Sequence, residues 1–294
     1  NIIFKNDSNP SLKKIEIQKK EDAVQLDLFG EPIVFGETSA SEEILPEPDL
    51  FSNFFVEEIG NAVQTSDKNS NLKASNLLFK KLYILDNEKF IEEFLQKISV
   101  CKKFSFSIAI DHFEVMSNKI LGIAFCLSKN EAYFLPFSKI ISEDKNLLKK
   151  FQKVFENEEI EKIGHQLKSS IVLLKRYGIS VKGNLFDTSI AHYLLQPELK
   201  HQQDYLAEIF LNYHCIAFES LFDEKLKEKS LASLPYGKYA DYLAEKACVD
   251  FYLYDALKDK IKEENLDYLC YEVEMPLIYV LADMEFTGVS IDTE

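Results

Sequence analysis

The sequence predicts a mixed α/β domain built on a central sheet. Three apolar runs, residues 104–110, 120–127 and 132–136, follow one another with only short polar segments between them. This spacing is typical of three strands joined as a meander. In the first two runs apolar side chains occupy both alternating sets of positions, which indicates strands covered on both faces. Helical spacing precedes and follows the three runs, so we expect a sheet flanked by helices.

The same patterns place the other elements. We expect an edge strand at 82–85, followed by a helix that Asp86 or Asn87 caps and that runs to Ser99. Its predicted inward face consists of Phe90, Ile91, Phe94, Leu95 and Ile98. In chain order, the further predictions are a helix over 147–155, a strand at 160–164, and helices over 165–177, 184–195, 204–213, 239–262 and 273–286.

Composition and charge narrow the class of protein. A hydrophobic content of 46% with 28% charged residues is typical of soluble globular proteins, and no apolar run reaches the ~20 residues of a membrane span. A net charge of −15 argues against tight binding of nucleic acid by this segment alone, because phosphate neutralisation needs Lys and Arg. The five cysteines are widely spaced, with no CxxC pair, so we expect reduced thiols in a cytoplasmic protein and no zinc site.

Three parts are predicted along the chain. Residues 1–75 form a flexible acidic linker, because residues 36–75 hold eight acidic and only two basic side chains among Ser, Asn and Pro. Residues 76–268 form the α/β domain, and residues 269–294 begin a further element. The first residue is Asn rather than Met, and we expect the chain to be a piece of a longer polypeptide.

Five short motifs carry a resemblance to a known family. The run EMPLIYVLADMEFTGVSID at 274–292 resembles the segment of bacterial family-A DNA polymerases (DNA polymerase I) that joins the 3′–5′ exonuclease domain to the thumb. Upstream, ILGIAF at 120–125, IGHQLK at 163–168, LFDT at 185–188 and YLAE at 242–245 match the exonuclease domain in the same order. The resemblance covers about residues 80–294. It implies a ribonuclease-H-like exonuclease fold, with a mixed central sheet flanked by helices, followed by the start of the thumb.

The resemblance also implies a set of site positions. Exonucleases of this family hold two metal ions with four carboxylates, because hard divalent cations need anionic oxygen ligands. The matching positions here are Ser107, Ala109, Ser170 and Lys246, which we call the four replaced positions; only the family's tyrosine is retained, as Tyr242. Ala109 has no ligand atom, neutral hydroxyls are poor magnesium ligands, and the ammonium of Lys246 would occupy the vacated charge site.

We therefore expect a catalytically inactive exonuclease-like domain with a structural role in a DNA polymerase of replication and repair. No cofactor is expected in this segment, whereas the resemblance implies magnesium for the parent polymerase. It also implies DNA as a partner through that polymerase, with no membrane association and a monomeric state. The alternative is a working proofreading exonuclease that uses displaced acids, with Asp111, Glu114, Asp241 and Asp250 as the candidates.

Smaller expectations concern single residues near these positions. Asp187 should cap a helix rather than bind metal, and Tyr242 should be packed rather than stacked on a base. Lys246 should pair with Asp250 or Asp111, since an unpaired buried ammonium is costly. His165 and His192 have no partnered cluster in the sequence, and neither receives a catalytic role.

A second binding signal lies in the predicted linker. The pentapeptide Gln25-Leu26-Asp27-Leu28-Phe29 resembles the short peptide by which bacterial replication and repair proteins dock on the sliding clamp. Such a peptide needs an anchoring Gln, a Leu and a terminal Leu-Phe pair on a flexible tether. The chain would then act as a clamp tether. Asp49-Leu50-Phe51 lacks the Gln and is a weaker repeat.

Overall fold

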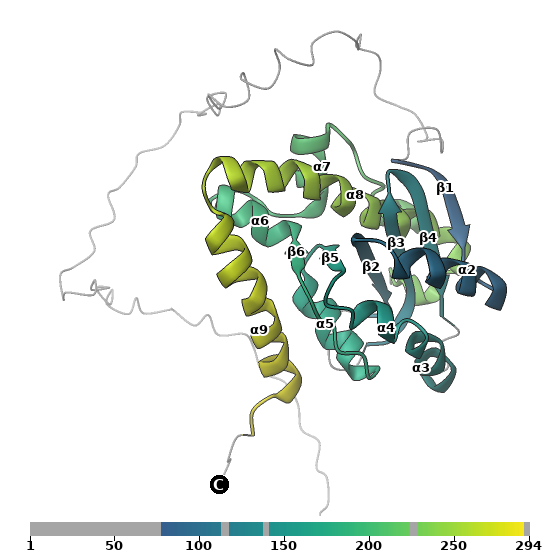
Figure 1. Ribbon diagram of the computed structural model, residues 1–294. Coiled ribbons are helices and arrows are strands. Elements are labelled where there is room, and N and C mark those ends of the chain that lie inside the picture. The colour runs from purple at the N-terminus through teal and green to yellow at the C-terminus, as the bar shows by residue number, and fades with distance from the viewer. Residues whose placement is uncertain (1–77, 113–117, 138–140, 224–228, 291–294) are drawn as a thin grey trace, which may run out of the picture. The chain divides into compact units, whose positions relative to one another are not determined.

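A computed structural model describes residues 78–112, 118–137, 141–223 and 229–290 of the chain (Figure 1). Within these residues the predicted α/β class is confirmed by a six-stranded sheet with the strand order β1-β4-β3-β2-β5-β6. The strands are β1 (Phe79–Ile84), β2 (Lys103–Ile110), β3 (Ile120–Ser128), β4 (Asn130–Pro136), β5 (Glu161–Gly164) and β6 (Leu185–Asp187). The clamp-like peptide and Glu114 lie outside the described residues.

The sheet is mixed, as predicted. β2, β3 and β4 form the antiparallel meander, whereas β1 pairs with β4 in parallel and β5 and β6 extend the sheet in parallel beyond β2. β1 confirms the expected edge strand. β6 was not predicted, since residues 184–188 were assigned to the start of a helix. A strand of three residues is too short to show alternation of apolar and polar side chains.

One face of the sheet carries an aromatic core under α2 (Glu88–Ser99) and α4 (Gln152–Phe155). Phe125 of β3 stacks on Phe151, with ring centroids 5.8 Å apart, and Phe94 of α2 contacts both rings. Asn87 caps α2 as predicted, because its side chain accepts a hydrogen bond from the backbone N–H of Phe90. The Phe90 side chain itself is 47% exposed, so its assignment to the inward face was wrong.

The single helix predicted over 147–155 is also corrected. The structure has α3 (Ile141–Lys149) and then α4, separated by residues 150 and 151. Phe151 lies at the break, and its side chain is fully buried in the aromatic core.

The opposite face of the sheet is covered by α8 (Tyr236–Glu263), the longest helix of the described chain. Ser105 of β2 donates a hydrogen bond from its hydroxyl to the backbone carbonyl of Ala247 in α8. The remaining described helical segments are α5 (Leu167–Arg176), α6 (Thr188–Leu195), α7 (Gln203–Leu211), the short 3₁₀ turns η2 (Phe218–Leu221) and η3 (Leu231–Ser233), the π-helical turn η4 (Leu269–Glu274) and α9 (Met275–Thr287).

α9 lies alongside α5, as the yellow helix in Figure 1 shows. Met275, Ile278 and Ala282 are buried in this contact region. Two ion pairs border it, Lys175 Nζ to Asp283 Oδ1 at 2.6 Å and Lys168 Nζ to Glu285 Oε2 at 2.7 Å. None of the helices in the described part of the chain combines the length and apolarity needed to cross a membrane.

Candidate functional site

β2 supplies two of the four replaced positions on the face that meets α8. Side chains alternate along a strand, so Ser107 and Ala109 project to the same side as Ser105, which bonds to α8. Ser107 is half-buried, whereas Ala109 is only 1% exposed and lies across the sheet from Gly122. The position of an expected metal ligand is thus a methyl group enclosed by packing.

Ser170 reaches the site from the neighbouring strand and helix. β5 pairs with β2, and α5 begins three residues after β5, so Ser170 lies one turn into α5 and is half-buried. The connection is tight because Gln166 adopts a left-handed conformation with φ of 54°. This turn holds the start of α5 against the carboxyl end of β5.

Asp187 fixes that turn from the end of β6. Its carboxylate caps α6 by accepting hydrogen bonds from the N–H groups of Ser189 and Ile190, as predicted. The same carboxylate accepts the N–H groups of Gln166 at 3.2 Å and Leu167 at 2.6 Å. Burial raises the pKa of Asp187, while these four donors oppose the shift. One buried side chain therefore supports the first turns of two helices, a second role that the sequence did not reveal.

Lys246 of α8 takes the place of the fourth expected carboxylate. Its Nζ donates to Gln203 Oε1 at 3.1 Å and pairs with Asp204 Oδ1 at 3.3 Å. Nζ also lies 5.0 Å from the ring centroid of Tyr242, one helical turn earlier. Burial lowers the pKa of Lys246, but Tyr242 and Asp204 more than offset it and the pKa rises. The site thus holds a fixed positive charge.

The predicted partners of Lys246 were wrong. Asp250 lies one turn further along α8, but it is buried and accepts a hydrogen bond from Thr188 Oγ1 at 3.0 Å. Asp111 instead accepts the N–H of Lys119 at 2.7 Å beyond the end of β2. Asp204, at the start of α7, was missed because only the tertiary packing of α7 against α8 brings it to Lys246.

A chain of polar contacts lies behind Lys246. His165 Nδ1 is 2.9 Å from Thr188 Oγ1, which also contacts Asp250. Burial and the nearby Lys246 ammonium lower the pKa of His165 to about 4, so the imidazole is neutral at pH 7. Burial raises the pKa of Asp250 to about 7, although the hydrogen bonds from Gln203 and Thr188 oppose this shift. His165, Thr188 and Asp250 therefore provide hydrogen-bond partners for one another near the start of α6.

His192 has a partner, contrary to the expectation from the sequence. Its Nδ1 lies 2.8 Å from Nδ1 of His201, and its Nε2 lies 3.2 Å from Gln196 Oε1. His201 follows α6 in a connecting segment, so sequence periodicity could not pair the two rings. No role for this pair was predicted.

Tyr242 is packed, as expected. Its side chain is 9% exposed, its ring lies 6.0 Å from that of Phe218, and burial raises the pKa of its hydroxyl. This environment is typical of a core aromatic residue, and the ring of Tyr242 also lies beneath the Lys246 ammonium.

The three candidate displaced acids that the structure describes do not form a cluster. Asp111 is engaged beyond β2, Asp250 is buried behind Lys246, and Asp241 is exposed on α8. Among the described residues, no group of three or more His, Cys, Asp and Glu side chains is arranged to hold a metal ion. All five cysteines are free thiols, as predicted.

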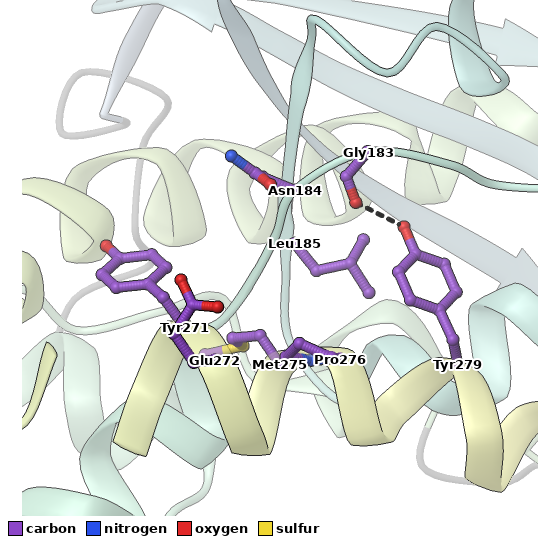
Figure 2. A pocket seen from close by; sticks show the side chains of 8 residues that line it. All are labelled: Gly183, Asn184, Leu185, Tyr271, Glu272, Met275, Pro276 and Tyr279. Carbon is purple, nitrogen blue, oxygen red and sulfur yellow. Dashed lines mark hydrogen bonds between the residues drawn. The ribbon is translucent and has the colours of Figure 1, made fainter. Parts of the chain in front are cut away.

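A cavity of about 200 Å³ lies elsewhere, between the approach to β6 and α9 (Figure 2). It shares no lining residue with the four replaced positions. Tyr279 closes one side of it and donates a hydrogen bond to the carbonyl of Gly183 at 2.8 Å. Tyr271, which also lines the cavity, has the only buried side-chain polar atom in the described chain without a hydrogen-bond partner.

Fold and site together define the class of protein. A mixed sheet with a central meander, α8 across one face and site positions on β2, α5 and α8 is the arrangement of a ribonuclease-H-like nuclease domain. The family described as "3'-5' exonuclease", from family-A DNA polymerases, matches residues 82–262, and the chain belongs to this family.

The curated relatives are DNA polymerases that are much longer than the segment matched here. DNA polymerase I of Borreliella burgdorferi is 29% identical over 208 residues, which cover 69% of this chain and 22% of that protein. DNA polymerase I of Helicobacter pylori is 29% identical over 217 residues, which cover 72% of this chain and 22% of that protein. The chain thus spans less than a quarter of the length of these two relatives.

Solved structures agree on the fold. The POL domain of Pol1 from M. smegmatis, in complex with primer-template DNA and dNTP, has a TM-score of 0.56 at 19% identity, covering 72% of this chain and 33% of that one. NrnC of Brucella melitensis has a TM-score of 0.55 at 13% identity, covering 70% of this chain and 92% of that one. At these identities the likeness supports the fold alone.

Proposed function

We propose that this chain is the exonuclease segment of a DNA polymerase of the polymerase I type, in which the 3′–5′ exonuclease domain no longer hydrolyses DNA. Its role is structural: it supports the polymerase portion, which acts on DNA in replication and repair and uses magnesium. The observation that carries this proposal is the ammonium of Lys246, held by Asp204 and Gln203 where the family has a carboxylate.

The donor set does not fit two divalent cations. Two such ions bring four positive charges, and the family balances them with four carboxylates. The four replaced positions offer two neutral hydroxyls, one methyl group and one positive charge. Lys246 would repel a cation, and no side chain at Ala109 can coordinate one. We therefore assign no metal-dependent step to this domain.

The nearby carboxylates are engaged in structural contacts. Asp187 accepts four backbone N–H groups, and Glu245 accepts hydrogen bonds from the Tyr213 hydroxyl and the N–H of Ile216. Asp250 is bonded to Thr188, and Asp204 to Lys246. Recruiting any of these carboxylates to a metal would break a buried hydrogen bond or an ion pair. This supports a structural rather than a catalytic domain.

A nuclease assay tests the proposal. The purified chain is incubated with 3′-labelled single-stranded DNA and magnesium or manganese, with an active exonuclease as positive control. We expect no digestion above background. Metal-dependent 3′–5′ digestion that disappears in Asp250→Ala or Asp111→Ala would show that displaced acids form a working site and would overturn the proposal.

Restoring the acids provides the reciprocal test. The quadruple variant Ser107→Asp, Ala109→Glu, Ser170→Asp, Lys246→Asp should gain binding of manganese, measured by calorimetry, if the site keeps its shape. The triple variant that retains Lys246 is the matched control and should bind less, because the ammonium remains. A folded quadruple variant without metal binding would show that packing around the enclosed Ala109 has closed the site.

The clamp-like peptide supports a second proposal, which rests on the sequence alone. We propose that Gln25–Phe29 tethers the chain to a bacterial sliding clamp with micromolar affinity, about −8 kcal/mol. Replacing Leu28 and Phe29 by Ala should abolish binding in a titration, since both anchors are lost. The same replacement at Leu50 and Phe51 is the control. Binding that survives the first double replacement would reject the peptide.

A further inference from the structure

The side of α9 that faces away from α5 is apolar and exposed. Its exposed residues include Val280, which is 54% exposed, and Met284, which is 64% exposed. We call this set the outer stripe; it consists of Val273 at the end of η4 and of Leu277, Val280, Leu281 and Met284 in α9. At 3.6 residues per turn the four stripe positions within α9 fall on the side away from Met275, Ile278 and Ala282, which are buried.

The polarity of α9 is therefore the reverse of that of an ordinary surface helix. Its charged residues Asp283 and Glu285 turn toward α5, where they pair with Lys175 and Lys168. Asp283 lies at the border of this contact, with its side chain 67% exposed, and the side opposite α5 is apolar. A surface helix normally places its charged residues outward, and a contiguous exposed apolar patch marks an interaction site.

The spacing of the outer stripe indicates the shape of its partner. Within α9, residues 277, 280 and 284 are separated by three and four positions, the spacing of a coiled-coil seam. Such a seam packs best against another helix that crosses at about 20°. The partner surface is thus an amphipathic helix rather than a strand edge or an extended peptide.

Charge indicates what flanks that partner helix. Residues 264–290 contain six acidic residues and no Lys or Arg. A helix with Lys or Arg beside its apolar face would be complementary to this surface. A second copy of the same surface would bring acidic flanks together, in a chain whose net charge is already −15.

We propose that the outer stripe is the docking face for an amphipathic helix with basic flanks, located in the polymerase portion of the same polypeptide. The proposal rests on the assignment of this chain to a polymerase I-type protein, not on the loss of nuclease activity. The curated relatives provide room for such a helix, since the matched segment is 22% of the Borreliella burgdorferi protein. Docking there would fix the exonuclease-like domain against the polymerase portion along α9.

Cysteine labelling tests the docking face. Val280→Cys is introduced into the 294-residue chain and into the complete polymerase polypeptide, and its reaction with a maleimide is followed by mass spectrometry. We expect labelling at least tenfold slower in the complete polypeptide. Val100→Cys is the matched control: Val100 is also an exposed valine, 82% exposed, at the end of α2. It should react equally fast in both proteins.

A second variant excludes an indirect effect. Adding Met284→Asp to the complete polypeptide that carries Val280→Cys should restore fast labelling, because a charge within the seam disrupts docking. Equal labelling of Val280→Cys in both proteins would overturn the proposal. So would concentration-dependent protection in the 294-residue chain together with dimers in sedimentation, which would assign the face to a second copy. Both results are independent of the nuclease assay, so the two proposals can fail separately.

Discussion

The junction held by Asp187 and the region of the four replaced positions lie close together in the fold but use polar groups in opposite ways. At the junction a buried carboxylate accepts four backbone N–H groups and caps α6. The four replaced positions carry two serines, an alanine and a lysine, where the family resemblance implies carboxylates. The carboxylate of Asp187 is needed by the backbone, whereas carboxylates at the four replaced positions would be needed only to bind a ligand.

This difference has a physical basis. Removing Asp187 would leave buried N–H groups without partners, which costs the full desolvation penalty of each group. At Ser107 and Ala109 the backbone is already paired in the sheet, so a change of side chain leaves the ladder intact. The fold therefore does not need a carboxylate at Ser107 or Ala109, whereas it does need the carboxylate of Asp187.

The largest expected effect is at Asp187. Asp187→Ala should lower the free energy of unfolding by about 3 kcal/mol or more, because several buried N–H groups lose their acceptor. Asn87→Ala is the control, since that exposed cap accepts one N–H and should cost only about 1 kcal/mol. Urea denaturation measures both. Equal losses in the two variants would mean that the double role of Asp187 adds nothing.

The next effect is a pH dependence at Asp250. Its pKa in the folded state is about 7, against an ordinary value of 3.8, so the protonated form favours folding. That contribution is fully present below about pH 4 and is lost as the pH rises through about 7.

In Asp250→Asn this titration is absent, while the amide oxygen can still accept from Thr188. The variant should therefore gain stability relative to the wild type between pH 4 and 8, on the order of 2 to 4 kcal/mol. Thermal unfolding across this range measures the difference, and Asp241→Asn controls for loss of a carboxylate on the surface of α8. A stability difference between Asp250→Asn and the wild type that does not change with pH would contradict the raised pKa of Asp250.

The smallest effect is expected at Lys246. Lys246→Met should change the free energy of unfolding by less than about 1 kcal/mol, because Asp204 is exposed and is solvated again when the pair is lost. Lys162→Met is the comparison, since the Lys162 ammonium is buried and donates to the carbonyls of Asn157 and Lys182. It should cost clearly more. A larger loss of stability in Lys246→Met would show that the ion pair with Asp204 contributes substantially to folding.

Much of the scaffold could be predicted because periodicity is local. The meander, the α2 cap at Asn87 and the capping role of Asp187 follow from alternation and from residue type. β6 and the break between α3 and α4 did not, because a three-residue strand is too short to alternate and the helical apolar spacing over 147–155 continues through the break.

At the site, the positions of Ser107, Ala109, Ser170 and Lys246 came from the resemblance, but their neighbours in space could not be predicted from the sequence. Asp204 reaches Lys246, and His201 reaches His192, only through tertiary packing. The first pair depends on how α7 packs against α8, and the second depends on the path of the segment after α6; no local pattern encodes either.

The attachment of α9 to α5 has a mechanical consequence. Its buried residues, two flanking ion pairs and the bond from Tyr279 to Gly183 hold the helix at several points along its length. Because these contacts are spread along α9, no single one of them can serve as a hinge. Salt would screen the two ion pairs but not the buried contacts. A rotation of α9 about any one of these contacts would therefore have to break the others.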